Sequence, residues 1–104
     1  MESNLYEHLK GVMGWSTVDG TMTPGASFAN FMAIHLSRTR LHPDFNKKGI
    51  YNCKTMKIFT SDVSHYSMKK GANLCGIGSD NIVAVKTDEN GRMIASELVK
   101  CIEE

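Results

Sequence analysis

Hydrophobic positions recur with a helical period at the start of the chain. Leu5, Leu9 and Val12 follow one another at intervals of three or four residues, so residues 2–13 are predicted to form a helix. Residues 14–25 contain glycines, Pro24 and several hydroxyl side chains, a composition that is typical of a loop. The pattern therefore predicts a first amphipathic helix followed by a long loop.

A second helix is predicted over residues 26–41, with two adjacent apolar stripes that we expect to be buried. The first stripe consists of Phe28, either Phe31 or Met32, and His35. The second consists of Ala29, Ala33 and Leu36. The helix should end at His42, because Pro43 disfavours the α conformation in the residue before it. Residues 43–54 are polar and basic, and we expect at most a weak helical turn there.

The second half of the chain alternates between strand and helix patterns. Residues 56–60 and 81–86 are rich in β-branched or aromatic side chains and are predicted strands, and a helix is predicted between them over residues 65–75. In that helix the side chains expected to point inward are Tyr66, Met68, Ala72 and Cys75. Residues 88–91 form a predicted turn, and a last helix should begin at Ala95.

The predicted order α-α-β-α-β-α places the chain in the α/β class. A strand, a helix and a second strand in about thirty residues form a βαβ unit with parallel strands and a right-handed crossover. No linker divides the chain, so residues 1–104 are assigned to one domain. Two strands make a poor core for a parallel sheet, and we therefore expect this segment to be an incomplete part of a larger domain.

Composition narrows the possible partners and the compartment. The formal net charge is +1, which argues against a nucleic-acid binder, and no apolar run is long enough to span a membrane. The basic residues between Arg38 and Lys57 are interpreted as a solvated surface. Three widely separated cysteines and an N-terminus without a signal-peptide pattern are typical of a cytoplasmic protein with free thiols.

The start of the second predicted helix has the features of a phosphate site. Gly25, Ala26 and Ser27 place small side chains and a hydroxyl where unpaired backbone N–H groups and the positive end of the helix dipole gather. A proline–glycine turn followed by a helix-capping serine would give the same residues, so spacing alone leaves both interpretations open.

A polar segment, residues 60–67, follows the first predicted strand. Ligands of open α/β sheets bind outside the carboxyl ends of the strands, and His65 could there stack on a flat ligand or move a proton; the alternative is a capping or surface histidine. A hydrolase triad is disfavoured because no Gly-x-Ser-x-Gly motif occurs. Residues 76–78 carry only half of a dinucleotide fingerprint, and the histidines and cysteines have no metal-ligand spacing.

Taken together, these motifs resemble the group II pyridoxal-phosphate decarboxylases. The resemblance rests on Gly14-Trp15-Ser16, Asp19-Gly20, Thr23-Pro24-Gly25-Ala26-Ser27-Phe28-Ala29-Asn30, Phe59-Thr60-Ser61, Ser64-His65-Tyr66-Ser67-Met68-Lys69-Lys70, Gly76-Ile77-Gly78 and Gly91-Arg92-Met93-Ile94. It runs from about residue 5 to the end of the chain. The most similar branch is that of the glutamate, cysteine sulfinate and acidic amino acid decarboxylases.

The resemblance implies a fold, a cofactor and a substrate class. It implies part of the large domain of fold type I, in which Ala26 and Ser27 hold the phosphate of pyridoxal 5'-phosphate. His65 would stack on the pyridine ring as a catalytic and cofactor-binding residue. The substrate would be a small acidic amino acid such as glutamate, aspartate or cysteine sulfinate, and the full-length protein would be a homodimer.

The sequence also departs from the family pattern. Gly25-Ala26 stands where the family has Gly-Gly or Gly-Ser, and Ala29-Asn30 where it has Ser-Asn. No lysine follows a histidine and no Asp-Ala-x-Trp run occurs, so the Schiff-base lysine and the aspartate that pairs with the pyridine nitrogen are missing. We therefore expect the chain alone to be an inactive fragment. The alternatives are a non-catalytic binding or interaction module and a small α/β domain for another phosphorylated ligand.

Overall fold

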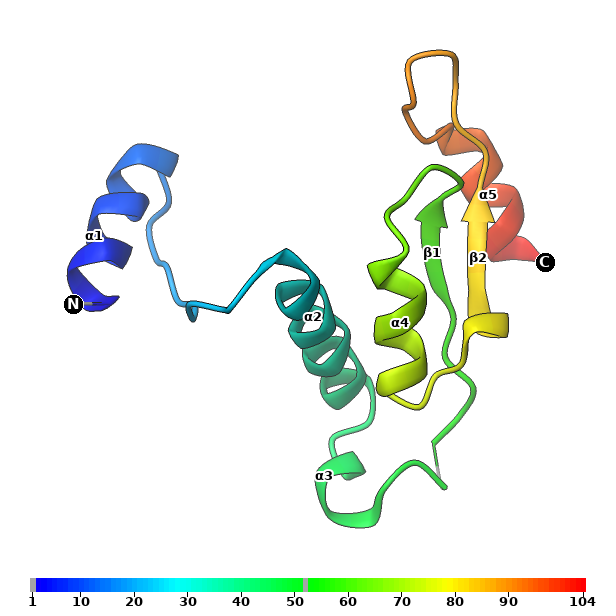
Figure 1. Ribbon diagram of the computed structural model, residues 1–104, viewed down its shortest axis with the longest axis horizontal. Coiled ribbons are helices and arrows are strands. Elements are labelled where there is room, and N and C mark those ends of the chain that lie inside the picture. The colour runs from blue at the N-terminus through cyan, green and yellow to red at the C-terminus, as the bar shows by residue number, and fades with distance from the viewer. Residues whose placement is uncertain (1, 52) are drawn as a thin grey trace.

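The computed structural model describes residues 2–51 and 53–104 of the chain, and Figure 1 follows it from the N-terminus to the C-terminus. The elements in chain order are α1 (Glu2–Met13), α2 (Ala26–Leu41), α3 (Phe45–Lys48), β1 (Ile58–Ser61), α4 (Ser67–Leu74), the 3-10 turn η1 (Ser79–Asn81), β2 (Ile82–Val85) and α5 (Ala95–Glu103). The predicted order of the main elements is confirmed, with α3 and η1 as short additions.

The centre of the fold is the βαβ unit. β1 and β2 are parallel, with a register that runs from Ile58 opposite Ile82 to Ser61 opposite Val85. α4 connects them, and its end is marked by Gly76 and Gly78, whose φ angles of 76° and 89° favour glycine. The parallel pairing is as predicted. The strands are shorter than the predicted ranges, and the helix begins at Ser67 instead of residue 65.

α2 packs against α4 at very close range. A Cβ atom added at Gly71 would lie 2.6 Å from Cδ1 of Ile34 and 2.9 Å from Cδ1 of Phe31, so the glycine allows the two helices to approach. Ile34 is buried on the α2 side, and Ala72 and Cys75 are buried on the α4 side. The inward positions predicted for Ala72 and Cys75 are confirmed, whereas Tyr66 precedes the helix and is exposed.

The buried face of α2 differs from the sequence expectation. Phe28 and Leu36 are 46% and 61% exposed, and Ala29 and Ala33 are exposed as well. The buried residues of this helix are Ile34 and Arg38, which lie four positions apart on the face that meets α4. Since α2 has apolar residues on most of its circumference, its sequence alone did not identify the face that α4 covers.

Arg38 also differs from the sequence expectation. It is buried and does not belong to a solvated basic surface. Its exposed fraction is 8%, its Nη1 donates to the carbonyl oxygen of Cys75, and its Nη2 lies 2.6 Å from Nδ1 of His35. The guanidinium carbon sits 3.7 Å above the ring centroid of Phe45, in cation–π geometry. Arg38 thus ties α2 to the end of α4 and to α3.

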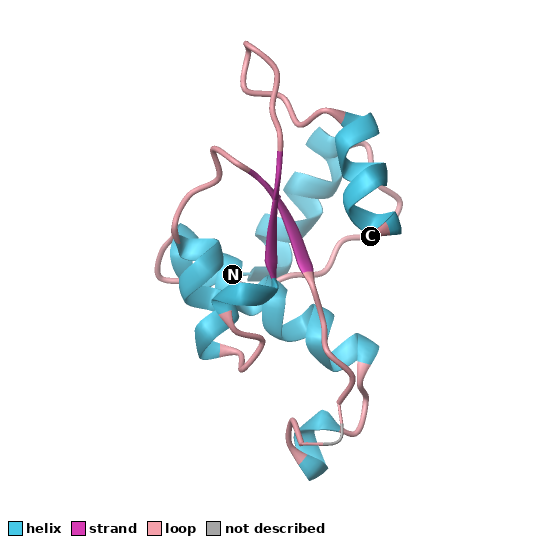
Figure 2. Cartoon of the chain, turned by 90° about the vertical axis from the view of Figure 1, so that its right-hand side faces the viewer, coloured by secondary structure: helices cyan, strands magenta, loops and turns pink. Residues whose placement is uncertain are grey.

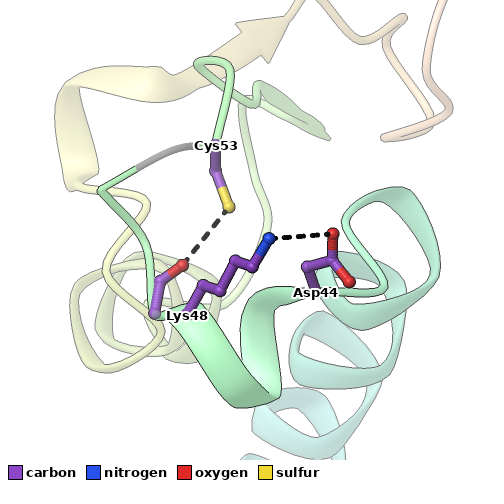
Figure 3. A network of polar contacts seen from close by, with 4 residues as sticks. Asp44, Lys48 and Cys53 are labelled. Carbon is purple, nitrogen blue, oxygen red and sulfur yellow. Dashed lines mark hydrogen bonds and ion pairs between the residues drawn. The ribbon is translucent and has the colours of Figure 1, made fainter.

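The segment between α2 and β1 is held by local polar contacts. Figure 3 shows Lys48 reaching back to Asp44, with 4.0 Å between Nζ and Oδ2. The thiol of Cys53 points to the carbonyl oxygen of Gly49 at 3.8 Å. Both ion-pair partners are exposed, so the pair contributes little stability, and the single turn of α3 agrees with the weak helical turn expected there.

α1 lies apart from the βαβ unit. Figure 1 shows it at the far left, joined to α2 by an extended loop, while α5 lies beside β2. The turned view in Figure 2 shows the two strands at the centre with helices on both sides. The fold therefore consists of a packed part that begins at α2 and an N-terminal part that stands away from it.

Candidate phosphate and ring site

The first turn of α2 offers unpaired N–H groups. Gly25 precedes the helix with φ of 119° and ψ of 161°, a conformation that favours glycine, and a Cβ atom added there would meet nothing within 4 Å. Among the described residues, none accepts a hydrogen bond from the N–H of Ala26 or Ser27. The first turn carries no acidic side chain. An anion could therefore approach the backbone closely and without charge repulsion.

The segment after β1 is a tight turn that leads directly to His65. Ser64 donates its N–H to the carbonyl oxygen of Ser61 at 3.1 Å, and the hydroxyls of the two serines lie 2.8 Å apart. Asp62 continues the strand pairing by donating its N–H to Val85 O at 2.9 Å, and its Oδ1 accepts the hydroxyl of Thr87 at 2.7 Å. The turn is thereby fixed to the carboxyl ends of both strands.

His65 lies at the exposed end of this turn and has a defined tautomer. Its Nδ1 accepts the backbone N–H of Ser67 at 3.2 Å. A backbone N–H can only donate, so in the neutral ring Nδ1 is an acceptor and Nε2 carries the proton. The imidazole lies 4.2 Å from the ring of Tyr66 at an interplanar angle of 37°. His65 therefore offers a flat ring surface and one N–H donor.

A cavity of about 300 Å³ is lined by the turn, by the start of α4 and by one face of the sheet. Its lining includes Thr60, His65, Met68 and Ala84. The volume lies at the lower end of the range of small-molecule sites, about 300–1,000 Å³. Ala26 and Ser27 are not part of this lining, so the two predicted halves of the site do not share one enclosed pocket in this chain.

The two halves are nevertheless joined by a buried hydrogen bond. Asn30, one turn after Ser27 on α2, donates from Nδ2 to Oγ of Ser67 at 2.9 Å, and Ser67 is completely buried. In Figure 1 the N-terminal ends of α2 and α4 lie at the same end of the molecule as the arrowheads of the two strands. Sequence reasoning gave no role to Asn30 and Ser67. The available signal was a polar amide in the interior of a largely apolar helix.

The geometry does not favour a hydrolase or a metal site. Oδ1 of Asp62 accepts from Thr87 and Nδ1 of His65 accepts from a backbone amide, so neither forms the bonds of a serine–histidine–aspartate triad. Across residues 2–51 and 53–104, no three His, Cys, Asp or Glu residues are grouped in a way that could hold a metal ion. Over the same ranges, no helix is both long and apolar enough to cross a membrane.

Comparison with known proteins identifies the relatives of this chain. Residues 1–104 match the family model described as the pyridoxal-dependent decarboxylase conserved domain. The chain is 39% identical to cysteine sulfinic acid decarboxylase of Rattus norvegicus over 102 residues, 98% of this chain and 21% of the relative. It is 44% identical to an acidic amino acid decarboxylase of Xenopus tropicalis over 86 residues, 83% of this chain and 17% of the relative.

A glutamate decarboxylase and a solved structure are also similar to this chain. Glutamate decarboxylase of Drosophila melanogaster is 37% identical over 103 residues, 98% of this chain and 20% of the relative. The crystal structure of mouse CSAD superposes with a TM-score of 0.93 at 37% identity, covering 98% of this chain and 21% of that one. The chain thus spans about a fifth of the length of the relatives it matches.

Proposed function

Since the chain belongs to the pyridoxal-dependent decarboxylase family, we propose that it forms the phosphate- and ring-binding wall of a decarboxylase for small acidic amino acids. Its relatives include decarboxylases of cysteine sulfinic acid, of acidic amino acids and of glutamate. The observation that carries the proposal is the hydrogen bond between Asn30 and Ser67, which links the open first turn of α2 to the turn that presents His65.

Ala26 and Ser27 are the proposed phosphate ligands. Their N–H groups have no acceptor among the described residues, and the first turn of α2 has no acidic side chain that would repel an anion. Ser27 is half-buried, and no capping hydrogen bond from a side chain is found for α2 within the described residues, so its hydroxyl is available to donate to a phosphate oxygen. These features fit the phosphate of pyridoxal 5'-phosphate.

His65 is the proposed stacking residue for the pyridine ring. Its side chain is exposed and lines the cavity at the strand ends, which leaves one ring face accessible. With Nδ1 engaged by Ser67, its Nε2–H remains as a donor that can orient an acidic substrate. When bound, pyridoxal phosphate supplies an electron sink for the bond that breaks as carbon dioxide leaves the amino acid.

We further propose that the chain acts within a cytoplasmic homodimer. Its three cysteines are free, which agrees with a reducing compartment. Among the described residues, large hydrophobic side chains are exposed on several elements, for example Leu36 on α2 and Ile102 on α5, so apolar faces remain for further parts of a large domain or for a second subunit. Residues outside the first turn of α2 and the turn that presents His65 would determine whether the substrate is glutamate, aspartate or cysteine sulfinate.

The test is the binding of pyridoxamine 5'-phosphate, which carries the ring and the phosphate but has no aldehyde that would react with surface lysines. We expect the purified chain to bind it, and Ser27→Ala to weaken binding by about 1–2 kcal/mol, the loss of one hydrogen bond to a charged group. Isothermal titration calorimetry measures both affinities. Ser37→Ala is the matched control, because it removes a hydroxyl whose bond to Ala33 O stays within α2.

The result decides between the proposal and its alternatives. An affinity unchanged by Ser27→Ala would remove Ser27 from the site, and no binding at all would favour a non-catalytic interaction module. Equal binding of inorganic phosphate and pyridoxamine phosphate would indicate a phosphate site without a ring wall. In a complete relative, His65→Ala at the corresponding position should lower turnover far more than it lowers the stability of the fold.

A further inference from the structure

Ser67 is the residue where two hydrogen bonds of the site meet. Its hydroxyl accepts from Asn30 Nδ2 at 2.9 Å, and its backbone N–H donates to His65 Nδ1 at 3.2 Å. The Ser67 side chain is completely buried, so the loss of a hydrogen bond there costs more than it would at an exposed site. Ser67 therefore connects a side chain of α2 to the ring of His65 through two successive hydrogen bonds.

α2 and α4 are held at a fixed separation by packing as well. Gly71, one turn after Ser67, lies against Ile34 and Phe31 so closely that a Cβ atom would be 2.6 Å from Cδ1 of Ile34. Asn30 is one turn before Ile34 on the same helix. The hydrogen bond thus fixes the register of the two N-terminal ends at the point where the helices already touch.

We propose that Asn30 is a positioning residue that acts through Ser67 on His65. Asn30 holds the Ser67 amide against Nδ1, which keeps the imidazole in the Nε2–H tautomer and fixes its distance from the first turn of α2. The inference rests on the proposed function, in which Ser27 binds the phosphate and His65 stacks on the ring. It adds that the hydrogen bond between Asn30 and Ser67 sets the spacing between these two residues. A ligand with both a phosphate and a flat ring then binds through two sites that are already in place.

The first measurement needs no cofactor. The ¹⁵N chemical shifts of the two ring nitrogens report the tautomer of each histidine, measured at a pH where the rings are neutral. In the unmodified chain we expect His65 to be the Nε2–H tautomer. In Asn30→Ala we expect its tautomer populations to shift towards those of His8, which is exposed. His35, whose Nδ1 faces Arg38 Nη2 at 2.6 Å, serves as an internal reference that should not change.

The second measurement compares ligands that carry one or both groups. Asn30→Ala should weaken pyridoxamine 5'-phosphate binding about three- to tenfold, the loss of about one hydrogen bond, and change the affinity for inorganic phosphate less than about twofold. Ser67→Ala should reproduce both effects, and Ser37→Ala neither. A general loss of structure would instead lower both affinities together.

Stability effects are separated by the double variant Asn30→Ala/Ser67→Ala, which removes donor and acceptor and leaves no buried hydroxyl without a partner. If it folds like the unmodified chain but keeps the altered His65 tautomer, the positioning role stands. The proposal is overturned if His65 is not Nε2–H in the unmodified chain, or if a folded Asn30→Ala or double variant keeps both the tautomer and the affinity ratio. An unmodified chain that shows the tautomer but binds no pyridoxamine phosphate contradicts the proposed function alone.

Discussion

The chain contains two regions with opposite packing. In the N-terminal arm, residues 2–25, none of the residues 3–25 is buried, and Val12, Met13 and Trp15 are 69%, 54% and 53% exposed. In the body, defined as the described residues from 26 onward, Ile34 is 6% exposed and Val85 is fully buried. Both regions form regular helices, yet among residues 3–51 and 53–104 buried side chains occur only in the body.

The difference shows that helix formation and burial have separate causes. The accessible surface of the chain is 8017 Å², whereas a folded monomer of 11.5 kDa has about 5,800 Å². The radius of gyration is 16.3 Å, compared with about 13 Å for a domain of this length. Local periodicity is sufficient to specify α1, but covering its apolar face requires neighbours that the described residues do not supply.

The largest effect is expected from a truncation in the body. Ile34→Ala should lower the free energy of unfolding of the body by about 2–4 kcal/mol, because a buried side chain loses its contacts with α4 and leaves a cavity. Val12→Ala in the arm should change it by less than about 0.5 kcal/mol, since Val12 is already exposed. Urea denaturation, monitored by amide exchange of α2 and α4, measures the free energy of unfolding of the body in both variants. Equal losses of this free energy would show that the arm is packed in solution.

A pair of glycines gives an intermediate test. Gly71→Ala should destabilise the body by about 1–3 kcal/mol, because the added methyl group overlaps Ile34 and Phe31. Gly11→Ala in α1 meets nothing within 4 Å and should instead raise the helicity of the arm. Circular dichroism and thermal unfolding of the two variants distinguish them. If Gly71→Ala were harmless, α2 and α4 would lie farther apart than described.

The smallest effect is expected within the arm itself. The hydroxyl of Tyr6 donates to the carbonyl oxygen of Gly20 at 2.6 Å and connects α1 to its following loop. Tyr6→Phe should weaken this contact by about 0.5–1 kcal/mol and speed proteolysis of residues 14–25 a few-fold, without changing the unfolding of the body. Trp15 fluorescence provides the second readout. A shift in body stability would show that arm and body are coupled.

Sequence alone predicted most of the elements of this fold because their signals are local. The bounds of α1 and α2 and the start of α5 follow from periodicity, from Pro43 and from the glycines, and the parallel pairing follows from the βαβ order. The buried face of α2 could not be predicted. It depends on α4, which is more than 25 positions away, and on the absence of a side chain at Gly71.

The candidate site was predictable in part for the same reason. The motifs and the positions at a helix start and a strand end single out Ala26, Ser27 and His65 as the proposed site residues. The Asn30–Ser67 bond spans 37 positions, and nothing local to either residue indicates the other. Arg38 was misread because an arginine in a basic stretch is usually solvated, whereas here its guanidinium meets Cys75, His35 and Phe45.

The βαβ unit also has a consequence for folding during synthesis. The pairing of Ile58 with Ile82 joins two strands across a helical crossover, so it cannot be complete before Val85 has emerged from the ribosome. Among the described strands, β1 and β2 each have one neighbour and one unpaired edge. Such edges can pair with any extended chain nearby, and the nascent protein is therefore exposed to aggregation for as long as these two edges stay unpaired.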